Sequence, residues 1–175
     1  MLFRLIYANL AVFLVMKAVY LLFWLIQLPS AELWITNWFA VPSNLSSLIT
    51  RPWTIFTYMF LHLDFFHILA NMLWLFFLGQ LFVQFLGEKK LWTFYIVGGL
   101  AGALLYILFF NFFPVFSDIN SIAKALGASA SVMAIVVAIG TYAPDFSIRL
   151  LFFGNIKLKY IALFSVILDV INISE

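Results

Sequence analysis

A serine two positions after a glycine opens an apolar run near the middle of the second half of the chain. Residues 126–133 read Leu-Gly-Ala-Ser-Ala-Ser-Val-Met and lead directly into the apolar residues 134–139. The first N–H groups of a helix lack partners within the helix, and the helix dipole adds about half a positive charge there. The pattern predicts Ser129 at a helix N-terminus, where a developing oxyanion would be stabilised.

Two histidines and an asparagine form a second polar group, with the spacing His62-x-x-x-x-His67-x-x-x-Asn71. His67 and Asn71 are four positions apart and share a face of the predicted helix, whereas His62 lies just before it. Polar residues at the head of a membrane helix must face protein or water. A lone histidine here is more often a packing residue, but the combination with a serine favours a catalytic site.

These residues could carry out acyl transfer. Serine becomes a nucleophile when a base takes its proton, and the intermediate needs hydrogen-bond donors for its oxyanion. His67 could be the base or a donor, and Asn71 only a donor. Ser131 lies about 200° around the helix from Ser129, which predicts a packing role. Asp169, in an apolar helix, is expected to have a structural or interface role.

The composition requires a lipid environment. Hydrophobic residues make up 66% of the 175 and charged residues 9%, against about 25% charged in soluble domains. A net charge of +2 does not favour nucleic acid as a partner. The absence of cysteine excludes disulfides, thiolate nucleophiles and cysteine-based metal sites.

Continuous apolar runs predict an all-α, polytopic membrane helix bundle, in one domain over residues 1–175, and not a β-barrel. The fourth predicted span is short for a bilayer, so Ser129 should lie below the membrane surface at the floor of a water-filled recess. The predicted spans cover residues 9–27, 65–86, 91–113, 129–142 and 158–171.

The segments between the spans carry further signals. Residues 28–57 combine prolines with several tryptophans, which predicts a structured loop at the membrane surface. Small residues at 98–103 predict close approach of another helix. Lys17, near the middle of the first span, should snorkel or find a partner, and we assign no function to it.

The distribution of basic residues predicts the orientation. Five spans would place six basic residues on the side of the N-terminus and two on the other side, which predicts a cytoplasmic N-terminus and an exterior serine turn. No targeting extension precedes the first span, which favours a bacterial plasma membrane. The six are Arg4, Lys89, Lys90, Arg149, Lys157 and Lys159, and the two are Arg51 and Lys124.

The two motifs, in this order, resemble the rhomboid family of intramembrane serine proteases over about residues 51–171. The resemblance implies a compact bundle of six helices that cleaves transmembrane segments of membrane proteins near the exterior face. It also implies that no metal or cofactor is needed, and that the partners are transmembrane substrates and the bilayer.

Carried over by position, the resemblance implies that Ser129 is the nucleophile. The oxyanion would be bound by the Ser129 backbone N–H, His67 and Asn71. His62 and Gly127 would support the site.

The chain departs from the family pattern at several positions. Ala130 stands where many members have glycine, Thr54 where arginine is common and Met133 where tyrosine is frequent. The family's general base is a histidine on a sixth helix, and these 175 residues supply five spans and only the histidines 62 and 67. We therefore expect the sequence to be an incomplete protease that is inactive as written and whose uncovered helix faces favour self-association.

Two alternatives remain open. The chain could be a non-catalytic rhomboid-like protein that binds transmembrane clients. It could also be a generic membrane bundle in which the histidines and serine coincide by accident.

Overall fold

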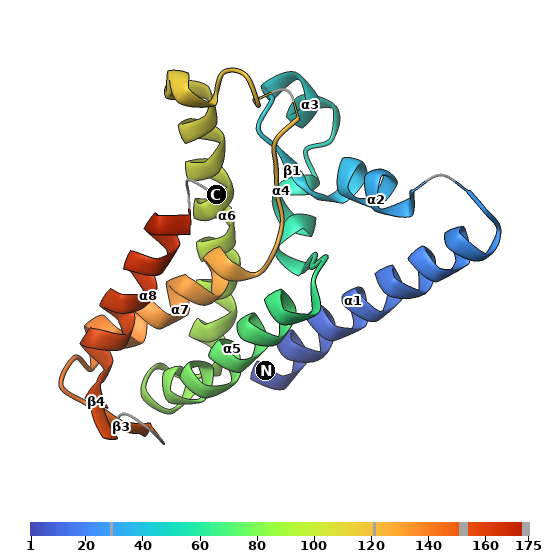
Figure 1. The fold of residues 1–175 in the computed structure, drawn as a ribbon. Coiled ribbons are helices and arrows are strands. Elements are labelled where there is room, and N and C mark those ends of the chain that lie inside the picture. Colours follow the sequence, from blue (N-terminus) through green and yellow to red (C-terminus); the bar gives the residue numbers. More distant parts are fainter. Residues whose placement is uncertain (29, 121, 151–153, 173–175) are drawn as a thin grey trace.

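The computed structural model describes residues 1–28, 30–120, 122–150 and 154–172, which form a bundle of helices (Figure 1). Three of the helices, α1, α5 and α6, are long and apolar enough to cross a bilayer, at 24, 22 and 25 residues. Two shorter helices, α7 and α8, complete the bundle. The bounds are α1 Leu2–Leu25, α5 Phe65–Leu86, α6 Glu88–Phe112, α7 Ser129–Tyr142 and α8 Leu158–Asn172.

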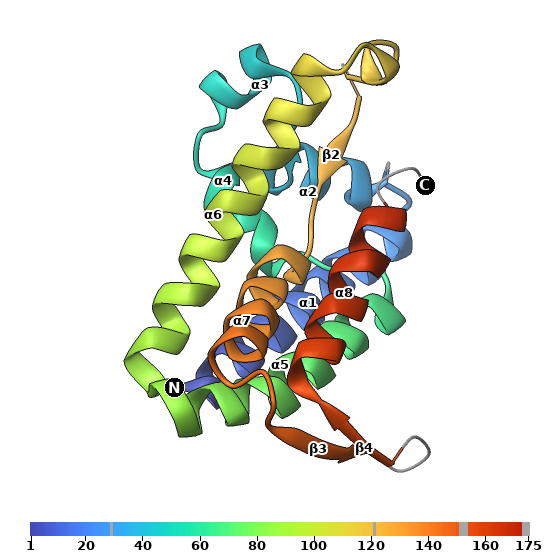
Figure 2. The same ribbon diagram turned by 90° about the vertical axis from the view of Figure 1, so that its left-hand side faces the viewer.

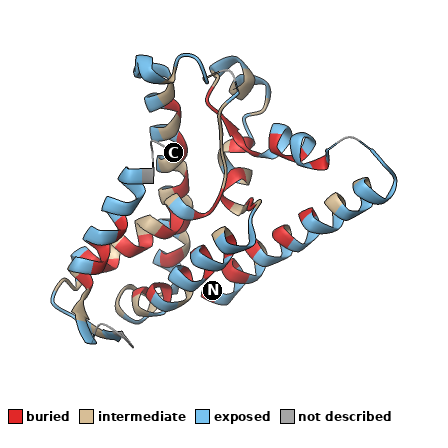
Figure 3. Ribbon diagram, in the orientation of Figure 1, coloured by how far each residue is buried: buried red, intermediate tan, exposed pale blue. Residues whose placement is uncertain are grey.

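Helix α7 is the centre of the bundle and packs against α5, α6 and α8, while α1 packs on α5. Figure 2 shows α7 between α6 and α8. The inward face of α7 is buried, with Ile135 and Ile139 fully covered. In Figure 3 the outer faces of α1 and α8 are exposed, and many of their exposed side chains are large and apolar, as expected for surfaces that face lipid.

The helix bounds differ from the predicted spans at several ends. Helices α5 and α7 have the predicted bounds, and α8 extends one residue further. Helix α1 begins at Leu2 and not at residue 9, because Leu2, Leu5 and Ile6 are buried in the core and belong to the helix. Helix α6 begins at Glu88, three residues before the predicted span, and ends at Phe112 where residue 113 was predicted.

The predicted surface loop is built from short helices and one strand. Trp38 and Trp53 stack with ring centroids 6.0 Å apart, and the Trp53 Nε1–H donates to the Trp38 carbonyl at 2.8 Å. The strand pairs antiparallel with β2, so this loop is tied to the segment that leads to Ser129. The elements of the loop are α2 Ala31–Phe39, β1 Val41–Pro42, α3 Leu45–Thr50 and α4 Thr54–Thr57. The 3-10 helix η1 Tyr58–Phe60 follows the loop, and the 3-10 helix η2 Pro114–Phe116 and strand β2 Lys124–Ala125 lie between α6 and α7.

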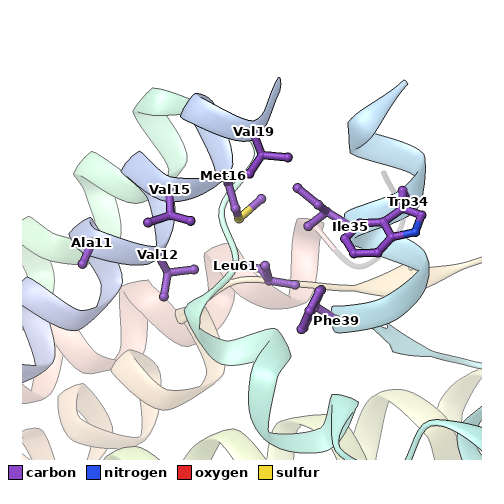
Figure 4. A pocket seen from close by; sticks show the side chains of 9 residues that line it. All are labelled: Ala11, Val12, Val15, Met16, Val19, Trp34, Ile35, Phe39 and Leu61. Atoms are coloured by element: carbon purple, nitrogen blue, oxygen red, sulfur yellow. The ribbon is translucent and has the colours of Figure 1, made fainter. Parts of the chain in front are cut away.

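Helices α1 and α2 diverge from each other and leave an apolar groove of about 360 Å³ between them (Figure 4). Leu61, which adjoins His62, lies at the inner end of the groove. The lining residues are Ala11, Val12, Val15, Met16, Val19, Trp34, Ile35, Phe39 and Leu61.

Close packing of α6 against α7 follows from small residues, as the sequence predicted. A Cβ added at Gly98 would overlap the Ala134 methyl group, and one added at Gly102 would overlap that of Ala130. A Cβ at Gly99 would lie 2.6 Å from the Ser131 Oγ. The glycines therefore let the backbones of the two helices approach next to the serine turn.

A β-hairpin joins α7 to α8, in the segment between the predicted spans 129–142 and 158–171. Strand β3 (Ser147–Leu150) pairs antiparallel with β4 (Gly154–Lys157). The hairpin lies at the end of the bundle that also holds the N-terminus of α1 (Figures 1 and 2).

Candidate active site

Ser129 is the first residue of α7 and its side chain is exposed. The residue before it, Ala128, has no side chain that could cap the helix. Within the described part of the chain, neither the hydroxyl nor the backbone N–H of Ser129 has a hydrogen-bond partner. A free hydroxyl therefore lies beside a free N–H donor at the positive end of a helix dipole.

The turn before Ser129 depends on Gly127. Its φ is +116°, a conformation that side chains disfavour. A Cβ at this position would lie 2.7 Å from Cε1 and 3.0 Å from Nε2 of His67. The His67 ring thus packs directly on the backbone of the turn, and the Gly127 N–H donates to the Tyr58 carbonyl at 2.9 Å.

His62 supports the same turn from beneath. It is fully buried, and its Nε2 accepts a hydrogen bond from the Ala128 N–H at 3.3 Å. Burial, and then the neighbouring His67 ring with its centroid 5.1 Å away, lower the pKa of His62 to about 4 against the opposing effect of the Phe60 carbonyl. His62 is therefore neutral at pH 7, with Nε2 as the acceptor.

The start of α5 positions His67 and Asn71. The Asp64 carboxylate caps the helix by accepting from the His67 N–H at 3.0 Å. Asn71 is buried one turn further on, and its Nδ2 donates to the His67 carbonyl at 3.0 Å. The described residues show no hydrogen bond between Ser129 and either of these side chains.

Ser131 and Asp169 lie apart from this group. Ser131 is fully buried against α6, with its Oγ 4.0 Å from the Met59 sulfur, as its predicted packing role requires. Asp169 is an exposed residue near the C-terminal end of α8. Neither shares the turn on which Ser129 lies.

Two contributions to the site were missed from the sequence. The first is the Tyr58 carbonyl, which accepts the hydrogen bond from the Gly127 N–H. A backbone acceptor of this kind cannot be recognised from a pattern of side chains. Lys17 donates from Nζ to the Leu63 carbonyl at 2.7 Å, and the same Nζ lies 5.3 Å from the ring centroids of both Phe13 and Tyr20. The intramembrane lysine therefore has a partner, and that partner adjoins His62.

A third contribution, the Asp64 cap, could have been predicted. An aspartate three residues before the bonded N–H, directly ahead of an apolar run, is typical of a helix N-cap. The sequence Asp64-Phe65-Phe66-His67 has this form.

Comparison with protein families matches residues 50–174 to the rhomboid domain. The chain belongs to the rhomboid family. This rhomboid is accordingly a membrane protein, a helical bundle of rhomboid type, and its histidine and serine motifs both lie within the matched region.

Two curated relatives of this rhomboid come from Arabidopsis thaliana. RHOMBOID-like protein 12, mitochondrial, is 28% identical over 133 residues, which are 71% of this chain and 40% of that protein. RHOMBOID-like protein 1 is 42% identical over 57 residues, 33% of this chain and 15% of the relative. The chain thus covers less than half of either relative. Because both are plant proteins, they do not support the predicted bacterial membrane.

Proposed function

We propose that this rhomboid is an intramembrane serine endopeptidase that cleaves transmembrane segments of membrane proteins, with Ser129 as the nucleophile. The observation that carries the proposal is the exposed, unbonded Ser129 hydroxyl at the N-terminus of α7, on a glycine turn against which His67 packs. By the charge bias of the loops, the N-terminus is cytoplasmic and cleavage occurs near the exterior face.

In the proposed reaction a base takes the Ser129 proton while Oγ attacks the scissile carbonyl carbon. The oxygen of that carbonyl becomes an oxyanion, which accepts hydrogen bonds from the Ser129 N–H, His67 and Asn71. Asn71 retains one Nδ2 hydrogen after its bond to the His67 carbonyl. The protonated base then gives its proton to the leaving amine, and water hydrolyses the acyl-enzyme ester.

The reaction also requires a general base. His62 is poorly suited, because its Nε2 already accepts the Ala128 N–H and its pKa is about 4. We assign the base to a histidine on a further helix, as the family resemblance implies. His67 is the alternative, since its ring touches the turn.

Cleavage in liposomes tests the proposal. The product of the whole gene and the 175-residue chain are reconstituted in parallel with a transmembrane segment fused to a soluble reporter. We expect the whole product to release the reporter and Ser129→Ala to reduce the rate by more than about a thousandfold. The matched control, Ser131→Ala, should retain cleavage within a few-fold. Unchanged cleavage by Ser129→Ala would exclude this nucleophile.

The same assay separates the two candidate bases. Cleavage by the 175-residue chain that is lost in Ser129→Ala would assign the base to His67. Cleavage by the whole product alone would assign it to a residue outside the two histidines.

A non-catalytic, client-binding role is the second candidate. It is favoured by the engagement of both histidines, one with the Ala128 N–H and one with the Gly127 backbone. In this case the transmembrane segment would cross-link to the whole product without being cut, and Ser129→Ala would not alter the cross-linking yield.

A further inference from the structure

Basic side chains gather at one end of the bundle, which we call the basic end. The N-terminus of α1, the turn between α5 and α6 and the β3–β4 hairpin all lie at this end (Figure 1). The terminal ammonium group contacts Glu88 Oε1 at 2.8 Å, and the rings of Phe85 and Phe146 meet with centroids 5.2 Å apart. The basic end comprises Arg4, Lys89, Lys90, Arg149, Lys157 and Lys159.

The charge of the two ends differs in sign. The basic end holds six basic side chains, the terminal ammonium group and two carboxylates, Glu88 and Asp145, which leaves a surplus of five positive charges. The segments that connect the helices at the opposite end hold two basic and three acidic side chains, a surplus of one negative charge. These are Arg51 and Lys124 against Glu32, Asp64 and Asp118.

Both carboxylates of the basic end are already engaged. Glu88 binds the terminal ammonium group. Asp145 accepts hydrogen bonds from Lys157 and Lys159, each at 2.9 Å, and these two lysines lower its pKa to about 2. The other four cations are exposed, and their side chains form no ion pair or hydrogen bond with any residue that the structure describes. They are Arg4, Lys89, Lys90 and Arg149.

The hairpin presents Arg149 away from the protein. Ile148 is paired with Ile156 across the two strands, and both pack against the core. Arg149, paired with Asn155, is one position along the strand and so points to the opposite face. The ion pairs of Asp145 with Lys157 and Lys159 stabilise the base of the hairpin, so the strand that carries Arg149 is held in place.

We propose that the basic end binds the headgroup phosphates of anionic phospholipids in the leaflet around it. Lys89 and Lys90 lie in the first turn of α6, and Arg4 lies in the first turn of α1, so these cations are at the ends of segments long enough to span the bilayer. Phosphates of the same leaflet lie at that depth, whereas a soluble macromolecule would have to pass between the headgroups. Each lysine or arginine near an anionic surface strengthens binding by about fivefold.

Lipid selectivity in reconstituted protein tests this inference. Spin-labelled phosphatidylglycerol and phosphatidylcholine are compared for their fraction immobilised at the protein surface. We expect the unaltered chain to prefer phosphatidylglycerol and to lose that preference as salt is added. Lys89→Gln with Lys90→Gln should reduce the preference by about tenfold or more.

The matched control removes the same charge from the opposite end. Arg51→Gln with Lys124→Gln should leave the preference unchanged. Equal loss in both double variants, or no preference in the unaltered chain, would overturn the inference. Arg149→Gln changes only the outer face of the hairpin and should reduce the preference by about fivefold. It therefore tests the inference independently if either double variant fails to fold.

Discussion

The backbone at Gly127 has a φ of +116°, and its Cα lies against the His67 ring. Ser129 and Ser131, two positions apart, consequently have different environments, one exposed on the turn and one buried beside Met59. Helix geometry alone predicted that difference, because two residues along a helix turn a side chain by about 200°. The residues alone did not predict the contact between Gly127 and His67, which are far apart in the sequence, although the resemblance implied that both belong to one site.

Gly127→Ala should destabilise the protein by about 1–3 kcal/mol through backbone strain, with a further loss from the clash with His67. Cleavage should fall by about a hundredfold because the turn moves. Gly87→Ala is the control, since φ is +87° there but a Cβ meets nothing within 4 Å. Denaturant unfolding in micelles measures both variants. Equal losses of stability would show that the His67 contact contributes nothing.

Acid should destabilise the protein through His62. Its pKa is about 4 in the folded protein, against 6.5 for an unperturbed histidine, so below pH 6.5 the unfolded chain takes up a proton that the folded chain does not. The free energy of unfolding should therefore fall by about 3 kcal/mol between pH 6.5 and 4. His62→Gln, whose amide oxygen can accept the Ala128 N–H, should have a shallower pH dependence. An identical slope would exclude His62 as its source.

Among the elements, the segment from η1 to the start of α5 connects the bundle to the serine turn. Its Tyr58 carbonyl and His62 ring accept hydrogen bonds from the turn, and its Leu63 carbonyl accepts a hydrogen bond from Lys17 of α1. Hydropathy located the neighbouring helices, but it contains no information about which carbonyl an intramembrane lysine reaches.

Lys17→Met should change the global stability by less than about 1 kcal/mol. The charged hydrogen bond contributes about 1.5–3 kcal/mol, and keeping the charge in the membrane costs a similar 2.5–3.5 kcal/mol. The local effect should be larger, because residues 61–64 lose their link to α1. Amide hydrogen exchange in this segment should accelerate in Lys17→Met and not in Lys17→Arg. Equal exchange in all three proteins would contradict the role of this link.

The α6–α7 interface should be intolerant of larger residues. Gly102→Leu would meet Ala130, next to Ser129, and should destabilise the protein by about 1–3 kcal/mol or more. Ala101→Leu, on the exposed face of the same helix, should be tolerated. Unfolding measurements on the two variants check this prediction, and similar stability of both would contradict the packing.

For the whole molecule, the sequence predicted the membrane bundle and the bounds of α5 and α7. The roles of the residues around the serine turn stay predictions. The sequence missed the helical residues 2–8, because the first apolar run continues into a segment with Arg4 and Tyr7 that is typical of an interface. It also missed the β3–β4 hairpin, whose four-residue strands are too short for a clear alternation. Both misses concern the basic end, where polar residues obscure the regular patterns.

Covalent labelling tests most directly whether Ser129 is an activated nucleophile. The whole gene product in liposomes is treated with a fluorophosphonate, and the adduct is mapped by mass spectrometry of the peptide that contains both serines. We predict a single adduct on Ser129, which forms on the folded protein and does not form when the protein is denatured before the reagent is added. An adduct on Ser131, or a protein that cleaves its substrate while Ser129 stays unmodified, would contradict the account.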